Sequence, residues 1–456
     1  MMKYKTLTSA LTFALVAVSG STLAAVTAEE AAELGKSLTP LGAVVGANSD
    51  GSIPAWTGGI TAAPAGYSEG DHHPDPFAAD KIEYTVTAAN YKDYDAVLTD
   101  GQKALFETYP DTFKMNVYKT HRSASFPQYI YDGTIANATR SSLADSGNGI
   151  VGAGAGIPFP IPKSGLEVIW NHIFRFRGVD VGRSAGQAAP MKSGAYTYIQ
   201  LKESIKFLSS AEDVTPEKLQ QTNMVFKFKQ SVTQPARLAG TALLVHETMD
   251  QVKQPRQAWT YNTGQRRVRR APNVAYDTPG TASDGLRTTD DYDMYNGSPD
   301  RYEWNLIGKQ ELLIPYNSYK LHSDTLKNDD ILKPGHIEPE LVRYEKHRVW
   351  VVEAQLKPGI SHIYKKRRFY IDEDSWQVSV ADIYDNRDQL YRVAMAHALN
   401  YYEVPALWST LEVFHDLQAR RYIAIGLDNQ EKMYDFGATL RDKDFTPAAL
   451  RKEGRR

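Results

Sequence analysis

The chain has 456 residues, enough for two or three average domains or for one large β domain. Hydrophobic residues make up 42% and charged residues 23% of it, so we expect a sizeable core rather than a disordered chain. The formal net charge of −2 provides no basic footprint for nucleic acid. The absence of cysteine excludes disulfides and thiolate metal sites. Tyrosine is abundant, and its ring suits half-buried sheet faces and amphipathic cavity walls.

Residues 1–24 have the pattern of a secretory signal peptide. Lys3 and Lys5 form a short basic start, an apolar run of about a dozen residues begins at Leu7, and small residues precede Ala25. This run is too short to span a bilayer, and no later stretch is long and apolar enough to do so. We therefore predict that the chain is exported to the periplasm and cleaved after residue 24.

Residues 25–193 are predicted to form a cover segment of short helices and irregular loops. Thr27 with Glu30 three residues later is the pattern of a capping box. Helices are expected at 27–36, 88–95, 100–109 and 165–177. The Gly- and Pro-rich stretch 152–162 lacks the lysine of a phosphate loop, and we interpret it as a flexible lid or linker.

From about residue 194 the apolar residues recur with a period of two, which is typical of β-strands. In the stretch 347–396, a Pro-Gly turn, an acidic turn at 372–375 and a polar turn at 385–388 separate four strands. Connections this short join antiparallel neighbours. Further strands are expected at 196–203, 225–233, 240–249, 256–261, 266–271, 304–315 and 414–426.

These elements predict an α+β protein that is mainly β, with one continuous, strongly curved antiparallel sheet over residues 194–426, in a half-barrel domain at 194–430 that is followed by a C-terminal tail at 431–456. The strand beginning at 347 is apolar on both faces at its centre, so we expect both faces of the sheet to be covered. A sheet of this size must curl or be covered to hide its edges, and the cover segment is available for this. Trp350 and Trp376 are expected to be buried.

Several segments resemble a family of uncharacterised exported proteobacterial proteins, a domain-of-unknown-function family related to the outer-membrane lipoprotein-sorting proteins. The matching segments lie in the same order as in that family and span nearly the whole mature chain. They are LTPLGA at 38–43, IPAWTGGI at 53–60, FPIPKSGLEVIWNH at 159–172, DDYDMYNGSPDRYEWNLIGKQELLIPYN at 290–317 and RYEKHRVWVVEAQLKPG at 343–359.

The resemblance implies a fold and a mode of action. The related superfamily includes the lipoprotein carrier LolA, its receptor LolB and the regulator RseB. Its fold is a half-open antiparallel barrel around helices, with an apolar concave face that holds acyl chains. Trp259 to Tyr261, followed by Arg266 to Val268, is similar to that superfamily's aromatic strand and basic return strand. The resemblance also implies an RND-type inner-membrane exporter and an outer-membrane protein as partners. The small carriers lack the N-terminal third of this chain.

Alternation along the strands suggests candidate cavity walls, although each of these side chains could equally be plain core. The candidates are Trp259, Trp350, Val352, Phe369 and Trp376. Two basic clusters are candidates for a rim that binds an anionic headgroup or an acidic partner. They are Arg266 and Arg267 on one hairpin and Lys365, Lys366, Arg367 and Arg368 on one strand. The competing interpretation of the second cluster is salt bridges to neighbours such as Glu353, with the charged heads in water.

The patterns typical of metal sites and of catalysis are incomplete. Asp71-His72-His73-Pro74-Asp75 has no further histidine at helical spacing, which favours a solvated turn over a metal site. The acidic stretch from Asp291 has glycine at position seven and tyrosine at position twelve of a would-be calcium loop, so an ordered acidic turn is favoured. No G-x-S-x-G nucleophile elbow is present. We predict no metal, no cofactor and no catalytic residues.

The predicted function is a periplasmic binding protein or carrier for a hydrophobic or lipid-like ligand, working with an export system toward the outer membrane. A curled sheet with apolar faces and a removable cover can shield acyl chains from water, at about 0.8 kcal/mol for each buried CH2 group. Two alternatives stay open: a regulator of RseB type that senses lipid or envelope stress, and a periplasmic lipid or polyester hydrolase. The sequence does not identify the ligand or the direction of transport.

Overall fold

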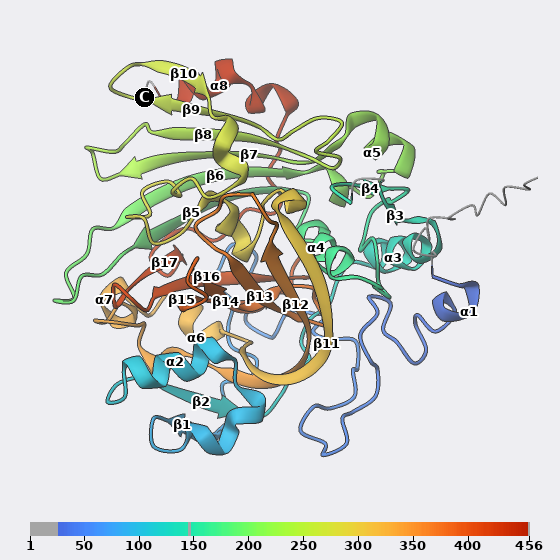
Figure 1. Ribbon diagram of the computed structural model, residues 1–456, viewed down its shortest axis with the longest axis vertical. Helices are drawn as coiled ribbons and strands as arrows, with labels where there is room; N and C mark the ends of the chain where they lie inside the picture. The colour runs from blue at the N-terminus through green and yellow to red at the C-terminus, as the bar shows by residue number, and fades with distance from the viewer. Residues whose placement is uncertain (1–25, 145–146, 455–456) are drawn as a thin grey trace, which may run out of the picture.

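The computed structural model describes residues 26–144 and 147–454, and one large curved sheet occupies most of it (Figure 1). The predicted signal peptide lies outside the described residues. The strands are β1 (Ile82–Thr87), β2 (Lys114–Tyr118), β3 (Ser142–Leu143), β4 (Ile150–Val151), β5 (Asp180–Ala188), β6 (Ile199–Phe207), β7 (Met224–Gln234), β8 (Ala242–Thr248), β9 (Gln257–Asn262), β10 (Arg267–Arg270), β11 (Tyr302–Pro315), β12 (Tyr344–Leu356), β13 (Lys366–Asp372), β14 (Val378–Tyr384), β15 (Leu390–Tyr401), β16 (Ala406–Asp416) and β17 (Arg421–Leu427).

The main sheet has 15 strands in the order β1-β2-β12-β13-β14-β15-β16-β17-β5-β6-β7-β8-β9-β10, with β11 also paired to β12. Strands β12 to β17 follow one another as an antiparallel meander, as the short turns between them predicted. The contact of β2 with β12 is parallel and consists of one residue pair. The sheet is mostly antiparallel and is not closed into a barrel, because its path ends on β1 and β10. The prediction of a curved, half-open α+β fold is confirmed.

The sheet takes in strands that precede residue 194. Strand β5 pairs with β17 and β6, so it joins the C-terminal meander to the strands β6 to β10. Its sequence, DVGRSAGQA, contains two glycines and little β-branched character, so local propensity did not reveal it. Strands β1 and β2 extend the other end of the sheet. Near the C-terminus, the single strand expected at 414–426 is the end of β16, a turn at 417–420 and β17.

Both faces of the central strands are covered, as the apolar character of β12 indicated. All seven residues of β14 and all eleven of β16 are buried. On one face lies α2 (Asp100–Thr108), where Gly101 approaches so closely that an added Cβ would lie 2.2 Å from a carboxylate oxygen of Asp382. On the opposite face, Arg392 of β15 donates a hydrogen bond of 2.6 Å to the carbonyl oxygen of Gly285. Figure 1 shows the segment between β10 and β11 in front of the sheet.

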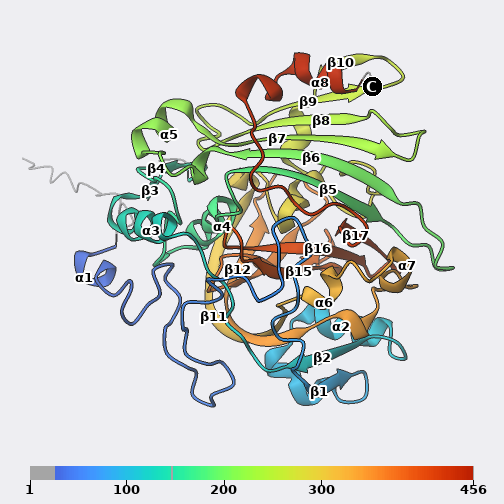
Figure 2. The same ribbon diagram turned by 180° about the vertical axis from the view of Figure 1, so that it is seen from behind.

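The helices are short and lie around the sheet (Figures 1 and 2). They are α1 (Ala28–Ala31), α2, α3 (Gln128–Arg140), α4 (Gly165–Phe174), α5 (Pro216–Thr222), α6 (Tyr319–His322), α7 (Asn328–Ile331) and α8 (Pro447–Glu453). The capping box of Thr27 and Glu30 is present, and α2 and α4 begin at the predicted residues. The expected helix at 88–95 is a 3-10 helix at Tyr91–Val97, and α3 had not been predicted.

The Gly-rich stretch after β4 is packed structure, so its interpretation as a flexible lid or linker is wrong. Residues 153–160 are buried against α3. The side chain of Asn137 accepts a hydrogen bond from the backbone of Gly154 at 2.9 Å and donates one to the carbonyl of Ala155 at 3.1 Å. Gly156 has φ +92° and approaches Thr134 so closely that a Cβ would lie 2.5 Å from its hydroxyl oxygen. Glycine is therefore required here for close packing.

The two tryptophans expected to be buried differ. Trp376 is completely buried and donates an indole hydrogen bond of 3.0 Å to the carbonyl of Leu41 in the cover segment. Trp350 is only half-buried, because its ring stacks on Trp376 on one side and meets the ammonium of Lys309 at 4.5 Å.

Replacing Trp376 by alanine is expected to lower the free energy of unfolding by about 3–5 kcal/mol, because it removes a large buried ring and leaves a cavity. Trp350→Ala should cost clearly less, since its ring already borders solvent. Urea denaturation of the two variants measures the difference. Equal losses would show that the two rings are equally important to the core.

Candidate ligand-binding site

The segment 272–296, which we call the covering segment, lies across the strands β7, β8 and β14 to β16 and is anchored through Asp293. The carboxylate of Asp293 pairs with Arg175 at 2.5 Å, pairs with Arg177, and accepts a hydrogen bond of 3.1 Å from the indole of Trp408. Both arginines follow α4, whose His172 bonds the backbone oxygen of Asp293 at 2.9 Å. The contacts hold Asp293 with φ +54°, a strained backbone region for a residue with a side chain.

The other carboxylates of the covering segment are also paired with the sheet. Asp290 pairs with Arg367 at 2.5 Å and with His362 at 3.1 Å. Asp291 accepts a hydrogen bond of 2.9 Å from the hydroxyl of Tyr364. The acidic stretch is thus an ordered turn whose oxygens bind protein side chains.

A narrow apolar cavity lies between the covering segment and the strands β7 and β8. Alternate residues of each strand face it, since Phe228 pairs with Val245 and Gln230 with Leu243 across the two strands. Its apolar wall consists of Phe226, Phe228, Leu243, Val245 and Val274. The cavity volume of about 40 Å³ is room for a few water molecules, not for an acyl chain. In this conformation the cavity is therefore too narrow to take an acyl chain.

A second, polar cavity of about 20 Å³ adjoins the first one on the same face of the sheet. Three polar side chains stand side by side across neighbouring strands there: Arg183 of β5, Glu203 of β6 and Gln230 of β7. Arg183 pairs with Glu203, and Gln230 donates a hydrogen bond of 2.6 Å to the same carboxylate. Glu412 of β16 also lines this cavity, and burial raises its pKa.

Three side chains line both cavities: Gln230, Arg287 and Tyr292. We call their meeting point the junction. Arg287 is 6% exposed, and its Nε is buried without a hydrogen-bond partner in the described ranges 26–144 and 147–454, while the side chain lines both cavities. The hydroxyl of Tyr292 is buried and likewise has no partner in this part of the chain. Its ring lies 5.0 Å from the ring of Phe228, centroid to centroid. The site therefore has an apolar end, a polar end and unpaired donors between them.

None of the five residues predicted as cavity wall lines either of these cavities. Trp259 points to the opposite face of the sheet, where it belongs to a cluster with residues of α8. Val352 and Phe369 are buried in the main core, and Phe369 stacks on Trp304 at 5.9 Å. Trp350 and Trp376 stack on each other at a different place, beside the start of the cover segment.

The predicted basic residues do not form one rim. Arg266 and Arg267 are exposed on the hairpin of β9 and β10. Lys365 pairs with Asp388, Lys366 lies 4.0 Å from the ring centre of Tyr384, and Arg368 pairs with Glu353 at 2.8 Å, as the salt-bridge interpretation proposed. Arg367 is 1% exposed and points toward the covering segment, where it pairs with Asp290, because neighbouring residues of a strand face opposite sides.

The sequence contained a signal for part of the site. In VFKFKQ, Phe226 and Phe228 alternate with Lys227 and Lys229, which places two aromatic rings on one face of β7. Arg287 gave no such signal, because it lies in an irregular segment and is enclosed by strands distant in sequence.

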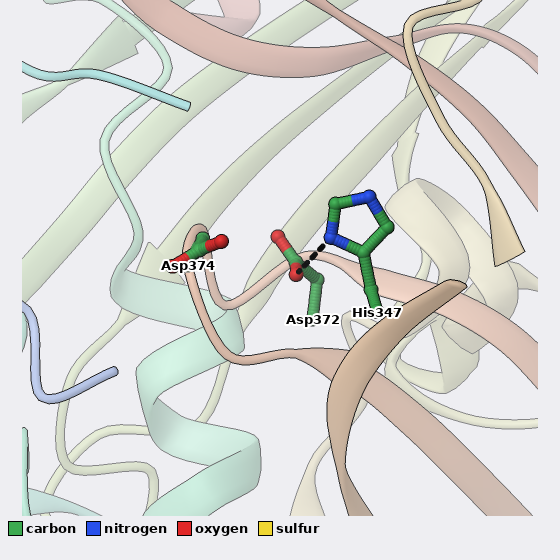
Figure 3. A group of neighbouring side chains, drawn as sticks. All are labelled: His347, Asp372 and Asp374. Atoms are coloured by element: carbon green, nitrogen blue, oxygen red, sulfur yellow. Dashed lines mark ion pairs between the residues drawn. The ribbon is translucent and has the colours of Figure 1, made fainter. Parts of the chain in front are cut away.

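A separate buried cluster is formed by His347, Asp372 and Asp374, whose potential metal-binding atoms lie within 4.8 Å of one another (Figure 3). Arg122 already occupies both oxygens of Asp374, at 2.8 and 2.6 Å. This leaves His347 and Asp372, fewer protein ligands than the three or four of zinc sites. Burial, together with the neighbouring Asp374, raises the pKa of Asp372 to about 7. The geometry describes a buried carboxyl group, Asp372, beside the ion pair of Arg122 and Asp374.

The histidines of the stretch 71–75 do not form a solvated turn. His73 is 4% exposed, bonds the carboxylate of Glu403 at 2.7 Å and bonds His322 at 3.2 Å. His322 in turn lies 3.0 Å from the carboxylate of Asp428. This chain of two carboxylates and two imidazoles ties the cover segment to the ends of β15 and β17. Burial lowers the pKa of His73.

The fold and the site together define a half-open sheet with a covered interior cavity. The family described as "Protein of unknown function (DUF1329)" matches residues 85–451, and the chain belongs to this family. It is 52% identical over 442 residues to "Uncharacterized protein PA3922" of Pseudomonas aeruginosa, with 97% of each chain covered.

The solved structures that this chain is similar to share little sequence with it. A DUF1329 family protein from Desulfovibrio piger has 14% identity and a TM-score of 0.43, covering 63% of this chain and 97% of that one. The LolA superfamily protein NE2245 from Nitrosomonas europaea has 12% identity and a TM-score of 0.37, covering 62% and 98%. Within the described residues, no helix has both the length and the apolar character needed to cross a membrane.

Replacing Asp293 by asparagine should lower the free energy of unfolding by about 3–5 kcal/mol, because it leaves Arg175 and Arg177 buried without a carboxylate. Asp388→Asn is the matched control, since its pair with Lys365 is exposed and should contribute less than about 1 kcal/mol. Urea denaturation measures both variants. A loss for Asp293→Asn no larger than that of the control would refute the anchoring role.

The raised pKa of Asp372 gives a prediction for the dependence of stability on pH. The folded protein keeps a proton on this carboxyl group that the unfolded chain releases near pH 4, so stability falls as the pH rises from about 4 to 7. Between pH 5 and 8, wild type should lose about 2–3 kcal/mol relative to Asp372→Asn. Chemical denaturation at both pH values tests this, and parallel curves for the two proteins would contradict it.

Proposed function

We propose that the protein is a periplasmic binding protein that holds a hydrophobic or lipid-like ligand between the strands β7 and β8 and the covering segment, and that it catalyses no reaction. The observation that carries this proposal is the pair of adjoining cavities, one apolar and one polar, beneath a segment without regular strands. An amphiphile has the matching division into a chain and a head group. Each CH2 group that leaves water would contribute about 0.8 kcal/mol to binding.

Ligand entry requires the covering segment to move, because the closed cavity has room for a few water molecules only. The segment contains left-handed backbone conformations at Ala282, Asp284, Asp293 and Met294, none of which is glycine. Such residues are held in place by their surroundings at a cost of about 1–3 kcal/mol each. An apolar chain that displaces the covering segment would release part of this strain, which supports opening as part of the binding step.

Export to the periplasm and cooperation with an RND-type inner-membrane exporter and an outer-membrane protein are parts of the same proposal. The signal-like residues 1–24 and the resemblance to lipoprotein-sorting proteins support them. The exposed Arg266 and Arg267 near the sheet edge at β10 are where we expect an acidic partner surface to dock.

The hydrolase alternative has one feature to be tested. Thr410 lines the polar cavity, and its hydroxyl lies 3.1 Å from His322. The same hydroxyl donates to Asp428 at 2.7 Å, so its proton is already directed to a carboxylate. We expect that the purified protein releases no p-nitrophenol from a p-nitrophenyl acyl ester. Hydrolysis of this ester by wild type that is lost in Thr410→Val would favour the hydrolase.

The binding proposal is tested with a fluorescent fatty-acid probe. Wild type should bind it, and Leu243→Trp should bind it at least about tenfold more weakly, because the larger ring fills the apolar cavity from a half-buried position. Val268→Trp is the matched control, since Val268 is half-buried on the opposite face against the cluster of α8. Fluorescence titration gives the affinities.

Lipid that co-purifies with the protein provides an independent measurement. Mass spectrometry of an organic extract should find an amphiphile with wild type and less of it with Leu243→Trp. If wild type binds no probe and carries no lipid, the proposal is wrong.

A further inference from the structure

We propose that the ligand has an anionic head group, a carboxylate or a phosphate, which binds at the junction to the guanidinium of Arg287 and the hydroxyl of Tyr292. This inference rests on the proposed function and assigns the chemical class of the ligand. It arises from two buried donors and from the balance of charge around them.

Arg287 is more than nine-tenths buried, yet none of the carboxylates in the described part of the chain lies within ion-pair distance of it. A buried guanidinium carries five N–H donors and stays charged at every physiological pH. The Nε–H of Arg287 is buried without a partner, and a buried donor that is left unsatisfied costs free energy. The other arginines of the site, by contrast, are each paired with a carboxylate. An anion at the junction would provide the missing partner.

The charges around the two cavities leave an excess of positive charge. Arg183 pairs with Glu203 and Arg256 with Glu247, whereas one carboxylate serves two arginines at Asp293. When Arg287 and Glu412 are counted as well, the site has five arginines and four carboxyl groups. Glu412 accepts a hydrogen bond of 2.9 Å from Ser409 and makes no ion pair within the described ranges, although it lines the polar cavity together with Arg287, whose charge acts to lower the pKa of Glu412 against the effect of burial. One further negative charge would balance the site.

Tyr292 supplies a second donor at the same place and links the head to the apolar end. Its hydroxyl is buried without a partner in the described ranges, and its ring contacts Phe228, which lines the apolar cavity. A head group at the junction would therefore direct its chain between the phenylalanines of β7 and the covering segment. A guanidinium and a hydroxyl suit a carboxylate, and the guanidinium fork also suits a phosphate.

The test compares three ligands with the same chain: dodecanoate, dodecyl phosphate and dodecanol, each titrated below its micellar concentration at pH 8. Wild type should bind the anions about 10- to 100-fold more tightly than the alcohol, as expected for charge-assisted hydrogen bonds. Arg287→Met should reduce the affinity for both anions to that for dodecanol and leave dodecanol binding unchanged. The order of the two anions distinguishes a carboxylate ligand from a phosphate ligand.

Two further variants make the test specific. Tyr292→Phe keeps the ring and removes one donor, so it should weaken anion binding several-fold and leave dodecanol binding unchanged. Arg387→Met removes a surface arginine whose side chain is 68% exposed, and it should behave as wild type toward all three ligands. Loss of anion preference in this control would show that only the overall charge matters and would overturn the proposal.

The melting temperature of the ligand-free protein gives an independent readout. If Arg287 is kept for ligand binding, Arg287→Met should be as stable as wild type or more stable, because an unpaired buried charge is removed. A clear loss of stability would show that the arginine holds the fold together and would contradict the proposal. If wild type binds all three ligands equally and Arg287→Met changes nothing, the anionic head group is refuted while the proposed function stands. If wild type binds none of them, the proposed function fails as well.

Discussion

The interior of the protein depends on the ion pairs of Asp293 with Arg175 and Arg177. A charge removed from water must find a partner, so this carboxylate positions three elements at once: the end of α4, the covering segment and β16 with its Trp408. Because two buried arginines share one carboxylate, one positive charge is left over, and hydrogen bonds from Arg175 to Gln377 and from Arg177 to the carbonyl of Ile173 offset part of its desolvation. The cavities lie beside this cluster, between the segment that it anchors and the sheet.

The remaining contacts of the covering segment follow the same principle. Asp290 binds Arg367 and His362, and Arg392 binds the backbone of Gly285, so polar groups from β13 and β15 are buried against the segment rather than exposed. These ion pairs and hydrogen bonds fix the position of the segment along the strands, whereas apolar packing alone would allow the segment to slide. At the apolar end, over β7 and β8, the segment contacts mainly aromatic and aliphatic side chains. Arg256, which also lines the apolar cavity, donates hydrogen bonds to the carbonyl oxygens of Val274 and Asn296, so the segment is held by polar contacts at this end too.

A site whose apolar cavity is too narrow for an acyl chain can still select its ligand through the head group that binds at the junction. Because the cavity is narrow, an acyl chain can bind only if the covering segment moves, so the two events are one coupled step. The binding free energy is then the free energy gained by burying the chain minus the free energy needed to displace the segment. A head group that binds at the junction, next to the anchored side, would not need to break the pairs of Asp293. The chain and the head group of the ligand would thus bind beside the apolar part and the ion-paired part of the same segment, respectively.

The sequence by itself determined the local structure: the period-two strands of the meander, the turns between them, the capping box of Thr27 and the start of α2. These features depend on neighbours within a few residues, and so does the conclusion that both faces of the central strands are covered. Only the tertiary structure decided that β5 is a strand, that Arg367 is buried while Arg368 is not in the core, and that Trp259 lies on the opposite face from the cavity. Alternation along a strand separates its two faces but does not say which face becomes concave. The environment of Arg287 likewise comes from strands and segments far apart in the chain, whose meeting is set by long-range pairing across the sheet and by the ion pairs that hold the covering segment against it.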